Sequence, residues 1–149
     1  MIIYTDGGCS GNPGPGGWAY VIVNGPDGPV IEEKWGAAAN TTNNRMELLA
    51  VISALESLSI PGLSGDIEVF TDSQYVQKGI TLWITDWKKR NWKTSSKAPV
   101  KNQDLWQRLD ALSAALPVSW HWVKGHAGNK FNERCDELTQ KAISSLYNA

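Results

Sequence analysis

Two short apolar runs along the chain end in the same Thr-Asp dipeptide. Residues 67–70 lead into Thr71-Asp72, and residues 2–4 lead into Thr5-Asp6. Both runs have the length and composition of buried strands. Parallel pairing of the two strands would bring Asp6 and Asp72 together at one end of a sheet. Buried carboxylates are costly unless a charge lies against them, and paired hard oxygens suit a divalent cation, with Mg²⁺ the first choice. The pattern therefore predicts a metal site at this end of the sheet.

Three further strands are predicted. Residues 18–23 and 30–37 flank the turn-forming segment 24–29, so they should form a hairpin that continues the first strand as an antiparallel meander. Residues 118–123 make the last strand. Because crossover connections are right-handed, the fourth and fifth strands can join in parallel beside the first. We therefore predict an α/β fold with a five-stranded mixed sheet of order 3-2-1-4-5 and helices packed on it.

Helical patterns occur between and after these strands. The predicted helices cover about 44–58, a short segment 74–78, the leucine-spaced residues 105–116 and about 132–146. Ile80, Trp83, Ile84 and Trp87 also have helical spacing, which is more typical of core than of a ligand site.

Two of the helices carry an acidic residue next to their apolar stripe. Glu47 lies one turn before Val51 on the inward face of the first helix, and Asp136 lies near the start of the last. A carboxylate in such a position needs a partner. Arg45 would make Glu47 a plain ion-pair member, whereas a metal at the end of the sheet would make it a ligand, and the sequence leaves both options open.

The segment 7–17 is rich in Gly and Pro, and we expect it to be irregular. It is not a phosphate-binding Walker loop, because no Gly-Lys-Ser/Thr sequence follows. Its glycines would let the backbone approach a sugar-phosphate chain closely, and a tight strand connection would explain them equally well.

Length and composition describe an ordinary globular protein. The 149 residues suit one domain spanning 1–149, with 42% apolar and 19% charged residues. No apolar run approaches the roughly 20 residues needed to span a bilayer, and no signal pattern opens the chain, so we expect a cytoplasmic protein without membrane contact. Cys9 and Cys135 should stay reduced. A zinc site built from them with His121 and His126 would lack the close ligand pairs of such sites.

Charge is unevenly distributed although the net charge is only −1. No acid falls between Asp86 and Asp104, a stretch that holds six of the fourteen basic residues and is interleaved with tryptophans. Such a pattern is typical of nucleic-acid binding. A solvated loop anchored by tryptophans explains the stretch about as well.

Taken together, these segments resemble bacterial type 1 ribonuclease H across nearly the whole chain. The matching motifs occur in order and at the family's spacing: Tyr4-Thr5-Asp6-Gly7, residues 11–17, Thr42-Asn43-Asn44-Arg45-Met46-Glu47, Thr71-Asp72-Ser73-Gln74-Tyr75-Val76, Trp87-Lys88-Lys89-Arg90, Pro99-Val100-Lys101-Asn102, Val123-Lys124-Gly125-His126-Ala127-Gly128 and residues 132–138.

The resemblance implies an endonuclease that hydrolyses the RNA strand of RNA–DNA hybrids, leaving 5′-phosphate and 3′-hydroxyl ends. It implies two Mg²⁺ ions roughly 4 Å apart, with Mn²⁺ as a possible substitute. The implied ligands are Asp6, Glu47, Asp72 and Asp136. His126, in a glycine-flanked loop, would carry a proton or assist product release.

The resemblance also implies contacts with the hybrid. Amide side chains would read the minor groove and the RNA 2′-hydroxyls, a hydroxyl and an amide would grip a DNA-strand phosphate, and an aromatic and a basic protrusion would hold the DNA strand. Asn40 departs from the family, which often has an arginine there, so the phosphate grip is weaker or rebuilt. The implied minor-groove and 2′-hydroxyl contacts are Asn12, Asn43 and Gln74, and the implied phosphate ligands are Thr42 and Asn102. The implied aromatic is Trp83, and the implied basic protrusion holds Lys88, Lys89 and Arg90.

Two other functions are alternatives to this one. A DNA nuclease related to integrases would keep the fold and the metals, and the three amides and the basic protrusion count against it. A hybrid-binding module without catalysis would gain nothing from four clustered carboxylates. We expect a monomer with no obligate protein partner.

Overall fold

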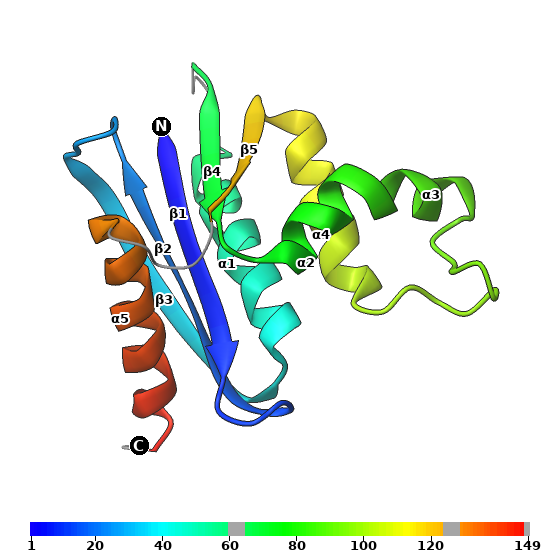
Figure 1. Ribbon diagram of the computed structural model, residues 1–149, viewed down its shortest axis with the longest axis horizontal. Helices are drawn as coiled ribbons and strands as arrows, with labels where there is room; N and C mark the ends of the chain where they lie inside the picture. The colour runs from blue at the N-terminus through cyan, green and yellow to red at the C-terminus, as the bar shows by residue number, and fades with distance from the viewer. Residues whose placement is uncertain (60–64, 124–128, 148–149) are drawn as a thin grey trace.

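A computed structural model describes residues 1–59, 65–123 and 129–147 of the chain. Its five strands form one sheet of order β3-β2-β1-β4-β5 (Figure 1). The first three strands pair antiparallel, β4 pairs parallel with β1, and β5 pairs parallel with β4. The predicted fold class and strand order are therefore confirmed. The strands are β1 (Ile2–Cys9), β2 (Gly14–Val23), β3 (Val30–Thr41), β4 (Ile67–Thr71) and β5 (Val118–Trp122).

Helices cover both faces of the sheet. In Figure 1, α5 lies across one face of the β1–β3 side and α1 lies behind the other, while α2, α3 and α4 extend to one side as a lobe. A π-helical turn, η1, joins α2 to α3. The bounds are α1 (Asn43–Leu58), α2 (Gln74–Lys78), η1 (Gly79–Trp83), α3 (Ile84–Lys89), α4 (Gln103–Ala115) and α5 (Lys130–Ser145).

The glycine-rich segment is more regular than its composition indicates. We expected 7–17 to be irregular, yet β1 continues through Cys9 and β2 begins at Gly14. β1 stays paired with β2 to its last residue, with Gly8 opposite Gly17 and Cys9 opposite Gly16. Glycine permits this pairing, because a Cβ at Gly16 would lie 2.9 Å from the carbonyl oxygen of Gly8. The expectation was wrong at both ends of the segment, since pairing with a neighbouring strand outweighed local propensity.

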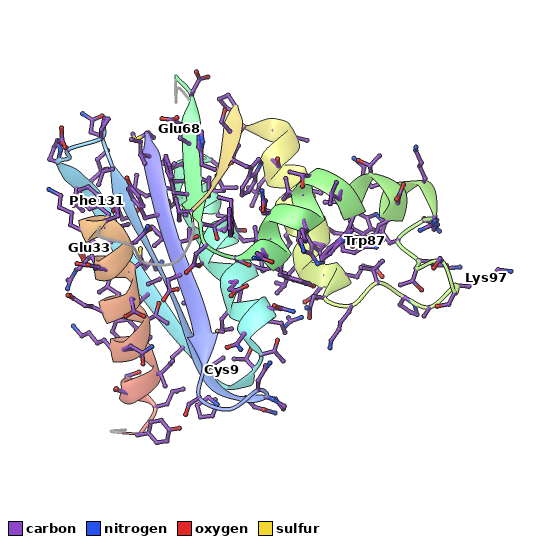
Figure 2. All side chains as sticks on the ribbon, viewed as in Figure 1. Cys9, Glu33, Glu68, Trp87, Lys97 and Phe131 are labelled. Carbon is purple, nitrogen blue, oxygen red and sulfur yellow. The ribbon has the colours of Figure 1, made fainter. Side chains whose placement is uncertain are left out.

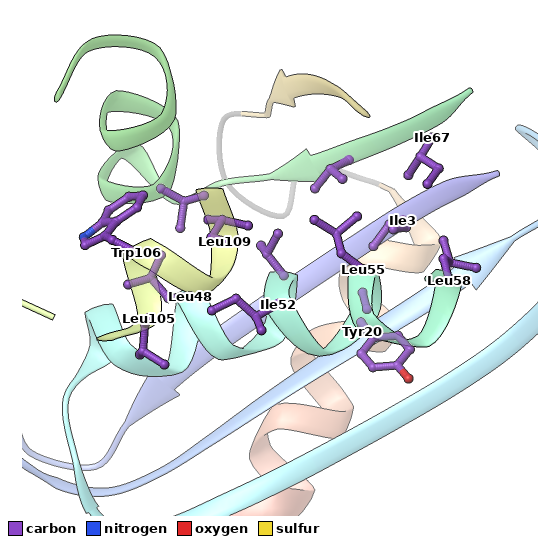
Figure 3. Packing of buried hydrophobic residues seen from close by; sticks show 14 of the residues in the cluster. Ile3, Tyr20, Leu48, Ile52, Leu55, Leu58, Ile67, Leu105, Trp106 and Leu109 are labelled. Atoms are coloured by element: carbon purple, nitrogen blue, oxygen red, sulfur yellow. The ribbon is translucent and has the colours of Figure 1, made fainter. Parts of the chain in front are cut away.

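The core has two layers, one on each side of the sheet. Alternation along β1 sends Ile3 to the α1 side and Tyr4 to the α5 side. The α1 side is the larger layer, in which Leu48, Ile52 and Leu55 of α1 meet Trp106 of α4 and strand residues (Figure 3). By the same alternation, Asp6 lies on the α5 side.

None of the helices in the described part of the chain is long and apolar enough to cross a membrane. Both cysteines are free thiols, Cys135 buried and Cys9 partly buried.

Candidate active site

The parallel register of β1 and β4 brings two acidic residues level with each other. Tyr4 pairs with Phe70, and Asp6 and Asp72 each lie two residues further along the chain. Side chains two apart on a strand share a face, so Asp6 lies on the α5 side with Tyr4, and Asp72 directly follows the last residue of the neighbouring β4. The structure thus provides the juxtaposition that the two Thr-Asp dipeptides predict.

Glu47 in the first turns of α1 completes a group of three acids, which we call the carboxylate cluster (Asp6, Glu47 and Asp72). Burial, and after it the negative charges of Asp72 and Asp6, raise the pKa of Glu47 to about 7, while a hydrogen bond from Ser73 acts in the opposite direction. Like charges within interaction range oppose ionisation of a buried carboxyl group. A cation bound in the cluster would offset both the cost of ionising a buried carboxyl group and the repulsion between the carboxylates.

Gly7 sets the distance between α1 and the sheet. A Cβ at this position would lie 2.5 Å from the carbonyl carbon of Met46 and 2.6 Å from the backbone nitrogen of Glu47. Only a residue without a side chain permits this approach. The N-terminus of the helix is fixed by Thr42, whose hydroxyl accepts a hydrogen bond from the backbone N–H of Arg45 at 3.3 Å. Together these residues place Glu47 against β1 at Gly7.

Ser73 is a contributor that sequence reasoning missed. Its hydroxyl donates to the carboxylate of Glu47 and accepts from the backbone N–H of Val76 at 3.1 Å, which caps α2. The backbone N–H of Ser73 donates to the hydroxyl of Thr71 at 3.1 Å. The available signal was a serine between a strand and a helix, the usual place for an N-cap.

Arg45 does not pair with Glu47. Its guanidinium binds both carboxylate oxygens of Asp104 at 2.9 and 3.1 Å. Residues two apart on a helix point in different directions, which explains why the ion-pair alternative for Glu47 is wrong.

Asp136 is half-buried on α5. Its neighbour Cys135 donates its thiol to the carbonyl oxygen of Tyr4 at 3.2 Å, and burial followed by the charge of Asp6 raises the pKa of that thiol. This part of α5 therefore lies against β1 close to Asp6. His126, the expected proton carrier, lies outside the described residues.

The donor set fits a divalent cation in its chemistry, because carboxylate oxygens are the ligands that Mg²⁺ prefers. Across 1–59, 65–123 and 129–147, no three His, Cys, Asp or Glu side chains stand close enough together to enclose an ion.

Two of the predicted substrate amides lie next to each other. The side-chain oxygen of Asn12 accepts from the backbone N–H of Asn43 at 3.2 Å, and that of Asn43 accepts from the backbone N–H of Cys9 at 2.8 Å. Because both carbonyl oxygens are bound to the backbone, the NH₂ groups are the ends that can turn outward. Gln74 is exposed at the start of α2, directly after Ser73.

Thr42 and Asn102, the predicted phosphate ligands, are connected through Arg45. The side-chain oxygen of Asn102 accepts from Nη1 of Arg45 at 3.2 Å, and the backbone N–H of Arg45 donates to Thr42. The Asn102 amide nitrogen donates to the hydroxyl of Tyr75 at 3.1 Å. The structure thus brings the two residues to neighbouring helix ends.

The basic stretch has the features of both interpretations offered for it, a nucleic-acid-binding surface and a loop anchored by tryptophans. Its tryptophans are partly buried and adjacent, with Trp83 5.8 Å from Trp87 and Trp87 6.4 Å from Trp92 between ring centroids. Figure 2 shows Trp87 within the side lobe and Lys97 at the tip of the protruding loop. The basic side chains Lys88, Lys89 and Arg90 are exposed, and Lys88 binds Asp110 at 3.3 Å. The tryptophans therefore anchor the loop, and most of the charge remains at the surface.

Comparison with known proteins gives one consistent result. The family model described as RNase H matches residues 1–144. Ribonuclease H of Treponema denticola is 56% identical, with 97% of each chain covered, and ribonuclease H of Cupriavidus pinatubonensis is 53% identical, with 98% of this chain and 97% of that one covered.

Solved structures agree with the sequence relatives. The crystal structure of LC9-RNase H1, described as a type 1 RNase H with the type 2 active-site motif, has a TM-score of 0.84 at 35% identity and covers 97% of this chain and 72% of that chain. LC11-RNase H1, solved in complex with an RNA/DNA hybrid, has a TM-score of 0.76 at 27% identity, with 98% of each chain covered.

Proposed function

The chain belongs to the ribonuclease H family, the metal-dependent hydrolases that cut the RNA strand of RNA–DNA hybrids, and we propose that its own carboxylates carry this reaction. The proposed ligands are the carboxylate cluster together with Asp136, and the proposed ions are two Mg²⁺, which Mn²⁺ can replace. We propose 5′-phosphate and 3′-hydroxyl products.

The observation that carries the assignment is the grouping of Asp6, Glu47 and Asp72 where β4 ends beside β1. Burial and the charges of the two aspartates raise the pKa of Glu47 to about 7, so its carboxyl group lies within interaction range of two other acidic side chains. A purely structural site would be better served by neutral residues. A site that binds cations gains from this arrangement.

Divalent ions bound there would activate the attacking water and neutralise charge on the phosphate. The chain's own residues supply the alignment. Ser73 holds the carboxylate of Glu47 by a hydrogen bond, and Gly7 allows α1 to approach the sheet. His126 is proposed to carry a proton during the reaction or to assist product release.

Substrate selection is proposed to lie on the same side of the molecule. Asn12, Asn43 and Gln74 offer amide donors and acceptors, which suit the 2′-hydroxyls that distinguish RNA from DNA. Thr42 and Asn102 would hold a phosphate of the DNA strand. Trp83 would contact the DNA strand, and Lys88, Lys89 and Arg90 would bind its phosphates. The complex of the relative LC11-RNase H1 with an RNA/DNA hybrid supports this substrate class.

We further propose that the protein acts as a monomeric single domain in the cytoplasm without an obligate protein partner. Family membership favours the nuclease over a binding module that lacks catalysis.

The test is cleavage of an end-labelled RNA–DNA hybrid beside duplex DNA and duplex RNA, with Mg²⁺ and with EDTA. We expect loss of RNA only in the hybrid and only with Mg²⁺, and product ends that a DNA polymerase can extend without phosphatase treatment. Asp27→Asn, which changes an exposed turn residue, provides the matched control variant. Cleavage of duplex DNA at the same rate would overturn the proposal.

A further inference from the structure

The hydroxyl group of Tyr75 accepts two hydrogen bonds, from Nδ2 of Asn102 at 3.1 Å and from Nε1 of Trp106 at 2.9 Å. We propose that Tyr75 is a positioning residue for substrate binding, whose hydroxyl aims the Asn102 amide at a phosphate of the DNA strand. The inference rests on the proposed function and adds to it a residue that does not itself touch the substrate.

The geometry starts in the core, at Trp106. This side chain is fully buried, and its ring fills the space beside Gly79, where a Cβ would overlap with it. Figure 3 shows the ring of Trp106 at the end of the layer formed by α1 and α4. A buried indole N–H needs an acceptor, and the Tyr75 oxygen is that acceptor. The position of the Tyr75 hydroxyl is therefore set by core packing.

Asn102 is held in one backbone conformation. Its φ of 60° and ψ of 29° are left-handed, a region that asparagine enters more readily than most residues. Its carbonyl oxygen accepts from the backbone N–H groups of Leu105 at 3.1 Å and of Trp106 at 3.0 Å, which begins α4. The direction in which the side chain leaves the backbone is thus fixed by the helix.

Hydrogen bonding then fixes the two ends of the amide. The oxygen of Asn102 faces a donor, Nη1 of Arg45 at 3.2 Å, and Arg45 is itself held by Asp104. The reverse orientation would set an NH₂ group against the guanidinium, donor against donor. With the nitrogen directed to Tyr75, one of its two hydrogens binds the phenol oxygen and the other can bind an anionic oxygen.

The sequence makes this orientation more important than usual. Asn40 occupies the position where the family often has an arginine, so the phosphate grip here depends more on neutral donors. A neutral donor must be correctly aligned, because hydrogen-bond strength falls steeply with angle whereas charge attraction does not. Loss of the Tyr75 hydroxyl should therefore weaken binding of one phosphate.

The experiment compares wild type with Tyr75→Phe, Asn102→Ala and the double variant. A matched control, Tyr20→Phe, removes the hydroxyl of a buried tyrosine in the core layer against which Tyr75 packs. Hybrids carry a single neutral methylphosphonate at successive positions of the DNA strand. The affinity of each hybrid is measured in Ca²⁺, with KM and kcat in Mg²⁺ and a thermal melt of each variant.

We expect Tyr75→Phe to raise the dissociation constant and KM about three- to tenfold while kcat stays within about twofold. In wild type, a methylphosphonate at the position that Asn102 contacts should raise the dissociation constant. This increase should be smaller in Tyr75→Phe. Tyr75→Phe should add nothing to Asn102→Ala, because the hydroxyl acts through that amide. Tyr20→Phe should leave the dissociation constant and the methylphosphonate penalty unchanged.

Unchanged affinity in Tyr75→Phe, a methylphosphonate penalty of wild-type size, or full additivity with Asn102→Ala would each overturn the inference while leaving the proposed function intact. If Tyr75→Phe does not fold, Asn102→Asp, which keeps the side-chain shape and removes the NH₂ donor, provides the second arm. That variant must lose the same methylphosphonate penalty. Wild-type protein that neither binds nor cuts the hybrid would overturn the proposed function and this inference with it.

Discussion

The hydroxyl of Ser73 connects the carboxylate of Glu47 to the N-terminus of α2. It donates to Glu47, which lies 26 residues earlier in the chain, and accepts from the backbone N–H of Val76. Ser73 thus orients the proposed ligand Glu47. It also caps α2, the helix that begins just after the other proposed ligand, Asp72.

Ser73→Ala should therefore have two effects. Loss of the cap should lower the free energy of unfolding by about 1 kcal/mol. Loss of the hydrogen bond to Glu47 should raise the Mg²⁺ concentration needed for half-maximal cleavage. Ser73→Thr retains the hydroxyl and should keep the wild-type Mg²⁺ dependence. An alanine variant that loses stability but needs no more Mg²⁺ would limit Ser73 to capping.

The raised pKa of Glu47 predicts how the stability of the metal-free protein varies with pH. Because the folded state holds this proton more tightly than the unfolded chain, the associated stability is present below about pH 4.5 and is lost as pH rises through about 7. The loss is on the order of 3 kcal/mol. The measurement is urea unfolding in EDTA at pH 5 and pH 8. Between these pH values, the free energy of unfolding of wild type should fall by this amount relative to that of Glu47→Gln. Parallel pH profiles for the two proteins would refute the environment assigned to Glu47.

Asp72→Asn should abolish cleavage while leaving the hybrid bound, because it removes a proposed ligand and leaves the basic surface intact. The measurement is single-turnover cleavage with saturating enzyme, combined with a binding titration. Asp27→Asn again serves as the control. Wild-type turnover by Asp72→Asn would exclude this site.

Replacement of Lys88, Lys89 and Arg90 by alanine should weaken hybrid binding and flatten its dependence on salt. The slope of log affinity against log salt falls by roughly 0.7 to 0.9 for each phosphate that the protein no longer neutralises. Lys88 also binds Asp110, so part of its charge is already neutralised. Turnover at saturating substrate should change less than affinity. Lys34→Ala with Lys141→Ala removes two exposed charges elsewhere, and an equal slope change per charge would mean that the stretch has no special role.

Much of this structure could be predicted from local pattern. The turn-forming segment 24–29, the two Thr-Asp dipeptides and the right-handed crossover rule together predicted the strand order and the proximity of Asp6 and Asp72. The glycine-rich segment could not be predicted in this way, because its regularity comes from pairing between β1 and β2. The ion pair of Arg45 with Asp104 likewise joins residues 59 positions apart.

The roles of residues that position other side chains could not be predicted from the sequence either. Ser73 and Tyr75 lie inside a motif of the family, yet their partners become evident only when α1, α2 and α4 are assembled. Ser73 could have been identified as a helix cap, and its bond to Glu47 could not. Tyr75 carries no charge or metal-binding group that would single it out.

Gly7 has a consequence for how this enzyme can vary. The backbone of α1 occupies the space where any side chain at residue 7 would lie. Substitution there would push the helix outward and carry Glu47 away from Asp6, although residue 7 has no functional group to lose. In a saturation library selected for activity, we expect position 7 to return glycine alone, so tolerance to mutation near the centre is limited by backbone spacing as much as by chemistry.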